Sequence, residues 1–189
     1  MNTETIREFV IAAHGDLPKV KTMLAENPDL LHVEFDWGEW GKENGIGAAA
    51  HVGNREIAEF FLAQGVPSNI CVAAMLGRVE EVREFLQADP ALANARGAHG
   101  ITVMFHAAMG GTTAIPQLLK DHGCKEGYSY ALHAAINTRD LAMVKWLLEN
   151  GVKDLSVQNY QGKTAMQLAQ EADQPEMIQL IEAFAAQQV

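Results

Sequence analysis

One stretch decides the architecture of this chain: residues 130–151 read YALHAAINTRDLAMVKWLLENG. Its first part is rich in small and apolar residues, with the pair Ala134-Ala135 at its centre, as expected of a short helix that packs closely on a neighbour. A turn follows at Arg139, after which the pairs Met143-Val144 and Leu147-Leu148 recur at helical spacing. The stretch therefore predicts a short helix, a tight turn and a second helix.

The same unit recurs along the whole chain. Each copy has a pair of mostly small residues that ends three positions before a turn residue. The turn residues are Gly15, Gly53, Gly77, Gly111, Arg139 and Asp173. Recurrence at a period of tens of residues is typical of a solenoid of stacked repeats, and paired alanines indicate helices that approach each other closely. We expect the alanine pairs to be fully buried between neighbouring helices.

These units resemble the ankyrin repeat, whose pattern is G-x-T-P-L-H-x-A-A-x-x-G followed by I-V-x-x-L-L-x-x-G. The resemblance is clearest in residues 100–111, 130–151 and 162–169, although no copy has an intact T-P-L-H and the repeats are therefore divergent. A long acidic loop at residues 33–43 is also similar to the Trp- and Gly-rich loop of some free-standing bacterial ankyrin proteins. The resemblance implies one all-α domain, residues 1–189, built as an ankyrin-type solenoid of about six helix-turn-helix repeats. It also implies that a partner binds on the concave face and on the projecting β-turns, or fingers.

The spacing of the turn residues predicts a further level of order. Successive intervals are 38, 24, 34, 28 and 34 residues, so that Gly15, Gly77 and Arg139 are each 62 residues apart. An ankyrin unit is about 33 residues long, and the shorter intervals lack the residues that would build a finger. We therefore expect three doublets, each with a finger inside it and none at the links between doublets. The corresponding modules are residues 1–67, 68–124 and 125–189.

Composition and motifs argue against several classes of function. The net charge of −10 would repel a duplex nucleic acid, and no apolar run approaches the roughly 18 residues of a membrane span. The N-terminal nine residues are polar, and two cysteines, Cys71 and Cys124, fit a reducing compartment. There is no phosphate-binding glycine loop, nucleophile elbow or C-x-x-C pair. We expect a cytoplasmic, non-catalytic protein with no cofactor and no metal, and with neither nucleic acid nor membrane as a partner.

The first finger is the most informative loop. It is four residues longer than the second finger, and the excess lies within residues 33–43, which include Trp37, Trp40 and four carboxylates against one lysine. Tryptophan in a glycine-containing loop is unfavourable unless it is buried or binds something. Two interpretations stay open: both tryptophans cover the first repeats as a cap, or at least one lines a binding surface.

Histidines form a second candidate group. His51, His99 and His106 are expected on or beside the concave face, close to Glu39 and Glu43 of the first finger. A histidine beside a carboxylate can bind a metal or act as a general base. No metal-binding spacing such as H-E-x-x-H occurs within one helix, so structural or surface roles for these histidines remain the alternative.

An apolar strip that includes Met75 and Met109 lies in the middle of the same face, where it forms either a groove or ordinary core. The leading hypothesis is a module that binds a protein partner. The alternatives are a small-molecule site, with or without catalysis, between the first finger and the histidines, and a scaffold that mainly self-associates. The residues expected to bind a partner or ligand are Trp37, Glu39, Trp40, Glu43, His51, Met75, His99, His106 and Met109.

Overall fold

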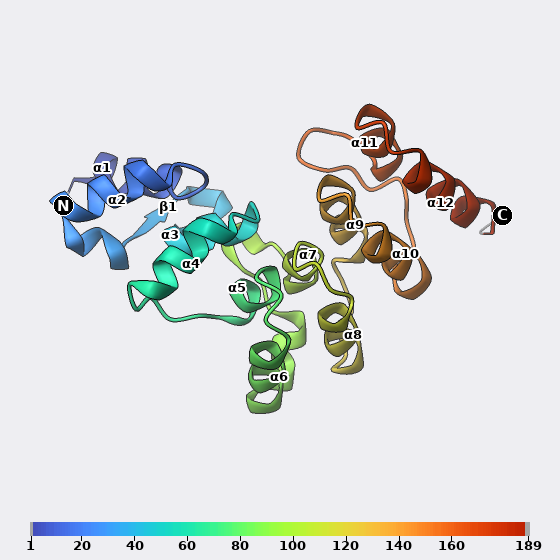
Figure 1. The fold of residues 1–189 in the computed structure, drawn as a ribbon, viewed down its shortest axis with the longest axis horizontal. Helices are drawn as coiled ribbons and strands as arrows, with labels where there is room; N and C mark the ends of the chain where they lie inside the picture. The colour runs from blue at the N-terminus through green and yellow to red at the C-terminus, as the bar shows by residue number, and fades with distance from the viewer. Residues whose placement is uncertain (1, 188–189) are drawn as a thin grey trace.

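A computed structural model describes residues 2–187 as an elongated, curved array of helix pairs, with the termini at opposite ends (Figure 1). The first helices of the pairs are α1 (Thr3–Ala12), α3 (Gly45–His51), α5 (Ile70–Met75), α7 (Val103–Ala107), α9 (Tyr128–Asn137) and α11 (Ala165–Glu171). The second helices are α2 (Leu17–Glu26), α4 (Arg55–Ala63), α6 (Val79–Ala88), α8 (Ala114–Asp121), α10 (Leu141–Asn150) and α12 (Pro175–Ala186). The predicted all-α solenoid of six helix-turn-helix repeats is thereby confirmed.

The turns inside the repeats follow the predicted register. Five of the six turn residues adopt a left-handed backbone: φ is 74° at Gly53, Gly77 and Gly111, 57° at Arg139 and 51° at Asp173. At Gly77 a side chain is excluded for a second reason, because a Cβ atom there would lie 2.4 Å from the carbonyl oxygen of Gly110. Glycine at this turn therefore lets the third and fourth units approach each other closely.

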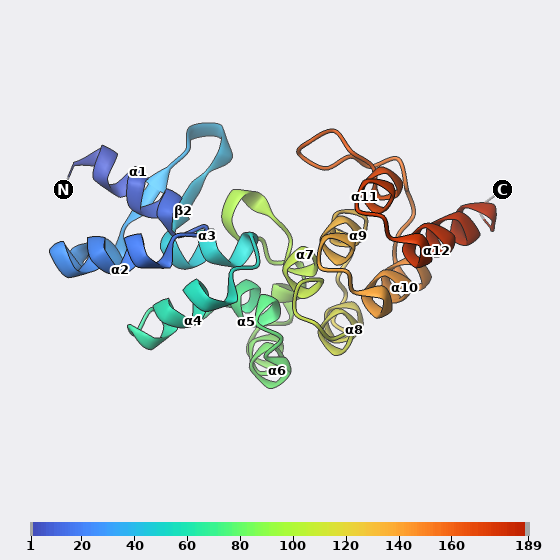
Figure 2. The same ribbon diagram turned by 45° about the horizontal axis from the view of Figure 1, so that its top comes forward.

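Three fingers project from the same side of the array (Figure 2). The first contains the antiparallel strands β1 (Glu34–Asp36) and β2 (Lys42–Asn44), preceded by the 3-10 helix η1 (Pro28–His32) and joined by η2 (Gly38–Trp40). The second is preceded by η3 (Pro90–Asn94) and has η4 (Ala98–Gly100) at its tip.

Strand pairing confirms that the first finger is the longer one. Its outermost pair, Glu34 with Asn44, spans four residues more than the single bridges Arg96–Thr102 and Gln158–Thr164 of the second and third fingers. Within the described residues, the links between α4 and α5 and between α8 and α9 contain no paired strand. The predicted alternation of fingers and short links is therefore correct, while the module boundaries stay a prediction.

The core explains why the paired alanines are needed. All ten residues of the five alanine pairs are at most 4% exposed, as predicted. The buried side chains form two apolar clusters that meet at α5, where Val72 and Met75 face the N-terminal cluster while Ala73 and Ala74 belong to the C-terminal one. Because Met75 is fully buried, this part of the apolar strip is core and not an open groove. None of the helices described here is long and apolar enough to cross a membrane.

Candidate functional site

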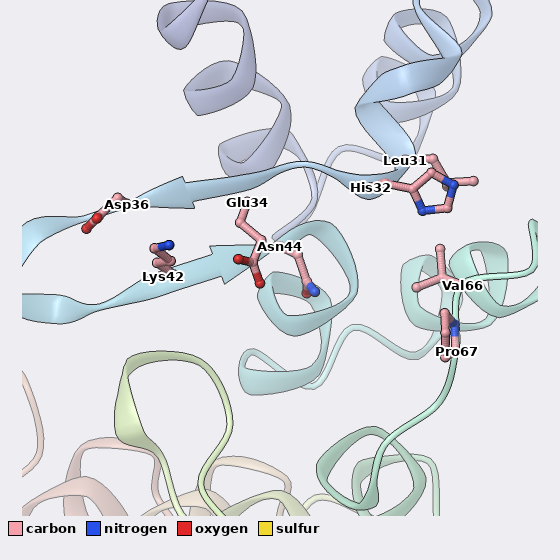
Figure 3. A pocket seen from close by; sticks show the side chains of 8 residues that line it. All are labelled: Leu31, His32, Glu34, Asp36, Lys42, Asn44, Val66 and Pro67. Carbon is pink, nitrogen blue, oxygen red and sulfur yellow. The ribbon is translucent and has the colours of Figure 1, made fainter.

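The antiparallel pairing of β1 with β2 gives the first finger two different faces. Since successive side chains of a strand point to opposite faces, Glu43 is directed away from the face of Lys42 and Asn44. The outer face borders a groove of about 540 Å³ against the link after α4 (Figure 3). The groove is lined by Leu31, His32, Glu34, Asp36, Lys42, Asn44, Val66 and Pro67. The Glu43 side chain, by contrast, is fully buried.

Three histidines from separate elements meet one carboxylate oxygen of Glu43. The distances to Glu43 Oε1 are 3.6 Å from His14 Nε2, 3.0 Å from His51 Nδ1 and 3.1 Å from His99 Nε2. His14 follows α1, His51 ends α3, and His99 lies in η4 of the second finger. These four atoms all lie within 4.8 Å of one another. The fold thus gathers a compact group of one carboxylate and three imidazoles between the first two fingers, which we call the His-Glu cluster.

Two of the imidazoles are oriented by backbone carbonyl groups. His14 Nδ1 lies 2.9 Å from the carbonyl oxygen of Val10, and His99 Nδ1 lies 3.1 Å from that of Trp40. A carbonyl oxygen only accepts hydrogen bonds, so we assign the proton to Nδ1 in both rings. In the neutral form, each ring then presents the lone pair of Nε2 to Glu43.

The two tryptophans of the first finger have different surroundings. Trp37 is half-buried, packs edge-on against Phe35 with ring centroids 4.5 Å apart, and donates a hydrogen bond from Nε1 to Glu43 Oε2 at 2.9 Å. The side chain of Trp40 is 72% exposed. Trp37 is therefore built into the finger, whereas Trp40 presents its ring to solvent.

The electrostatics of the His-Glu cluster keep the carboxylate charged. Burial by itself disfavours the charged form of Glu43, but the side-chain contact with His51 and the electrostatic influence of His51, His14 and His99 together bring the pKa below its usual value of 4.5. His51 Nδ1 and Glu43 Oε1 are close enough for a hydrogen bond but poorly aligned, and both atoms are buried without a hydrogen-bond partner. A charged carboxylate oxygen and a ring nitrogen thus remain unsatisfied at the centre of the cluster.

The structure gives His106, Glu39, Met75 and Met109 no place among the ligand atoms of the His-Glu cluster. His106 is 1% exposed, its Nδ1 lies 2.9 Å from the carbonyl oxygen of Thr102, and burial lowers its pKa to about 4. It is thus a neutral core histidine at physiological pH. Glu39 is exposed at the fingertip, Met75 is core, and Met109 is half-buried.

His14 is the member of the cluster that the sequence analysis missed. It immediately precedes the turn residue Gly15, in the register that places side chains on the concave face. That register was the available signal, but His14 lies far from the first finger in sequence and no spacing connected the two.

A small cavity of about 200 Å³ adjoins the cluster, with Glu43, Cys71 and His106 in its lining. Its volume is below the roughly 300 Å³ at which sites for small organic ligands begin. Burial raises the pKa of the Cys71 thiol to about 12, so this cysteine is not a reactive thiolate at neutral pH. The cavity is of a size that suits an ion or a few water molecules.

Comparison with known proteins identifies the type of repeat. A family model for ankyrin repeats (3 copies) matches residues 70–153 and 124–187, which together make up more than half of the chain. No curated protein matches the sequence. Among solved structures, one similar chain is found in the complex of the Bd0816 predatory endopeptidase from Bdellovibrio bacteriovorus with immunity protein Bd3460. That match has 24% identity and a TM-score of 0.45, and it covers 93% of this chain and 96% of the other.

Proposed function

The chain belongs to the ankyrin repeat family, and we propose that it is a non-catalytic cytoplasmic module that binds a protein partner through its concave face and fingers. The observation that carries the proposal is the exposure of aromatic side chains on the fingers. Trp40 on the first finger is 72% exposed and Tyr160 on the third is 93% exposed. Large aromatic side chains are unfavourable in water, and Trp and Tyr are the residues most often found as anchors at protein interfaces.

The positions of the large exposed apolar residues also support a binding surface on the fingers and the concave face. These residues are Ile11, Trp40, Val52, Tyr130, Leu141 and Tyr160. Five of these six lie on fingers or on first helices and their ends, and only Leu141 lies on a second helix. Since the three fingers project from one side of the array (Figure 2), a single partner can contact them together.

Charge indicates what kind of partner fits. Glu34, Asp36 and Glu39 of the first finger are all exposed, and the whole chain carries a net charge of −10. Complementary charge speeds association and disfavours wrong partners more than it adds affinity. We therefore expect a partner with a basic surface, and an association rate that falls as salt is added.

Affinity purification from the native cytoplasm, followed by binding measurements with the purified partner, tests the proposal. Trp40→Ala should weaken binding about tenfold or more, because a buried aromatic anchor contributes about 2 kcal/mol or more. Leu141→Ala is the matched control, since it removes an exposed apolar side chain from a second helix. If Trp40→Ala binds with wild-type affinity and Leu141→Ala does not, the partner uses a different surface and the proposal fails.

A further inference from the structure

We propose that His14, Glu43, His51 and His99 bind a single divalent transition-metal ion of the zinc class, through three imidazole nitrogens and one carboxylate oxygen. The inference rests on the geometry of these four side chains and does not depend on the proposed protein partner.

The spacing of the ligand atoms suits tetrahedral coordination. Zinc binds histidine nitrogen and carboxylate oxygen at about 2.0–2.2 Å, which separates the ligand atoms of a tetrahedron by roughly 3.3–3.5 Å. The three distances from Glu43 Oε1, at 3.0, 3.1 and 3.6 Å, lie on either side of that value. The remaining separations between ligand atoms are at most 4.8 Å, so side-chain movements of about an ångström would close the polyhedron around one ion.

Hydrogen bonds around the cluster orient these ligands toward its centre. A metal-binding histidine usually donates its other ring N–H to a carbonyl or carboxylate, which fixes the tautomer and the direction of the free lone pair. His14 and His99 do this through Nδ1, with carbonyl groups of the backbone as acceptors. Trp37 Nε1 occupies the second oxygen of Glu43 and leaves Oε1 to face the histidines.

A cation at the centre of the cluster would satisfy buried groups that the protein leaves without a partner. Glu43 Oε1 and His51 Nδ1 are both buried and have no hydrogen-bond partner. The ring centroid of His51 lies only 4.9 Å and 5.0 Å from those of His14 and His99. One divalent ion would coordinate these two atoms together with the Nε2 atoms of His14 and His99.

The donor set selects the class of metal. Imidazole suits zinc, copper, iron and nickel, whereas calcium and magnesium require mostly oxygen ligands. Four protein ligands fill a tetrahedral site, which is characteristic of structural rather than catalytic zinc. The histidine side chains are 31%, 13% and 22% exposed for His14, His51 and His99, so an ion can enter from solvent.

The bound ion would cross-link four separate segments of the fold. Its ligands come from the turn after α1, the end of α3, strand β2 and the tip of the second finger. The ion would hold the first two fingers together and, because His99 also bonds to the carbonyl of Trp40, would fix the backbone that carries this exposed ring.

Metal titration of the whole 189-residue chain tests this inference. Protein freed of metal with a chelator should bind one equivalent of Zn²⁺ in a competition assay, and Co²⁺ should give the intense visible absorption of a four-coordinate site. His51→Ala and Glu43→Gln should each weaken Zn²⁺ binding about a hundredfold or more, since even residues that only orient a ligand cost 10–100-fold. His32→Ala is the matched control, because His32 is exposed on the outer face of the first finger region and should leave affinity unchanged.

His14→Gln serves as a second variant should either of the first two fail to fold by circular dichroism, because His14 is the most exposed ligand and its loss disturbs the core least. Stoichiometric Zn²⁺ binding that is lost in the folded cluster variants and kept in His32→Ala would support the site. The inference is overturned if the wild-type protein binds neither Zn²⁺ nor Co²⁺, or if folded His14→Gln and His32→Ala bind Zn²⁺ equally.

Discussion

The first and third fingers occupy the same place in their doublets, yet they present opposite chemistry. Glu43 and Lys163 each precede the residue that closes the finger, Asn44 and Thr164 respectively. Glu43 is fully buried among three histidines, whereas Lys163 forms a surface ion pair with Glu171. The repeat therefore determines where the backbone goes, and single residues at matched positions determine what each finger can bind.

The comparison also shows why, within residues 2–187, the proposed metal site lies at the first finger and not at the third. The four extra residues of the first finger form a true two-stranded hairpin, and the next finger supplies His99. In the second finger the matched residue is the half-buried Ile101, an apolar side chain. A polar site thus needs both a carboxylate at this position and a neighbouring finger that offers ligands.

The largest difference in stability between the two fingers is expected when the side chains at the matched positions, Glu43 and Lys163, are truncated to alanine. Glu43→Ala should lower the free energy of unfolding by about 3 kcal/mol, because it leaves buried partners of a charged network without a counterpart. Lys163→Ala should cost about 0–1 kcal/mol, since it removes only an exposed ion pair. Urea denaturation in the presence of a chelator measures both, and similar losses would contradict the claimed difference in burial.

The stability of the protein should depend on pH through His106, the buried histidine of α7. The unfolded chain protonates His106 near pH 6.5 but the folded protein only near pH 4, so stability is complete above pH 6.5 and declines as pH falls toward 4. That difference corresponds to up to about 3 kcal/mol at pH 4.

Unfolding free energies of the wild type and of His106→Gln, measured from pH 7.5 to pH 4, test this expectation. The variant should lose less stability than the wild type over that range, whatever its stability at pH 7.5. Parallel curves would show that His106 does not remain neutral in the folded core.

Aromatic side chains of the two fingers allow a finer test. Trp37→Phe keeps a ring but removes the N–H that bonds to Glu43, and it should cost about 2 kcal/mol, as is usual for a hydrogen bond to a charged group. Tyr160→Phe removes a hydroxyl from a residue that is 93% exposed, and it should leave the melting temperature unchanged. Equal thermal stability of the two variants would mean that the Trp37–Glu43 bond contributes nothing.

The smallest difference in stability is expected at a feature that the first and third fingers share, a glycine with positive φ. Gly41 and Gly162 have φ values of 79° and 73°, and the nearest atom to an added Cβ at either position is Gln158 Oε1, 4.0 Å from that of Gly162. Alanine should cost about 1 kcal/mol or more at either position, through backbone strain, because positive φ is unfavourable for residues with a Cβ and Gly41, with ψ of −169°, has a conformation nearly restricted to glycine. Similar losses in denaturation experiments would show that the fingers differ in side chains and not in tip geometry, whereas a much larger loss at one glycine would refute that.

The sequence by itself determined the periodic features of this protein. The alanine pairs, the positions of the tight turns, the 62-residue recurrence and the extra length of the first finger were all readable, because each depends on local conformation and burial repeated along the chain. Repetition makes such a prediction robust, since an error in one copy is corrected by the others.

Only the tertiary structure decided which polar residues meet. His14 and His99 lie 29 and 56 residues from Glu43, and His99 reaches it from a left-handed backbone with φ of 56°. A shift of one residue in the pairing of β1 with β2 would have turned Lys42 or Asn44 inward instead of Glu43. Strand register, the conformation of one loop residue and the distance between adjacent fingers are set by packing across repeats, and none of them is encoded in a local pattern.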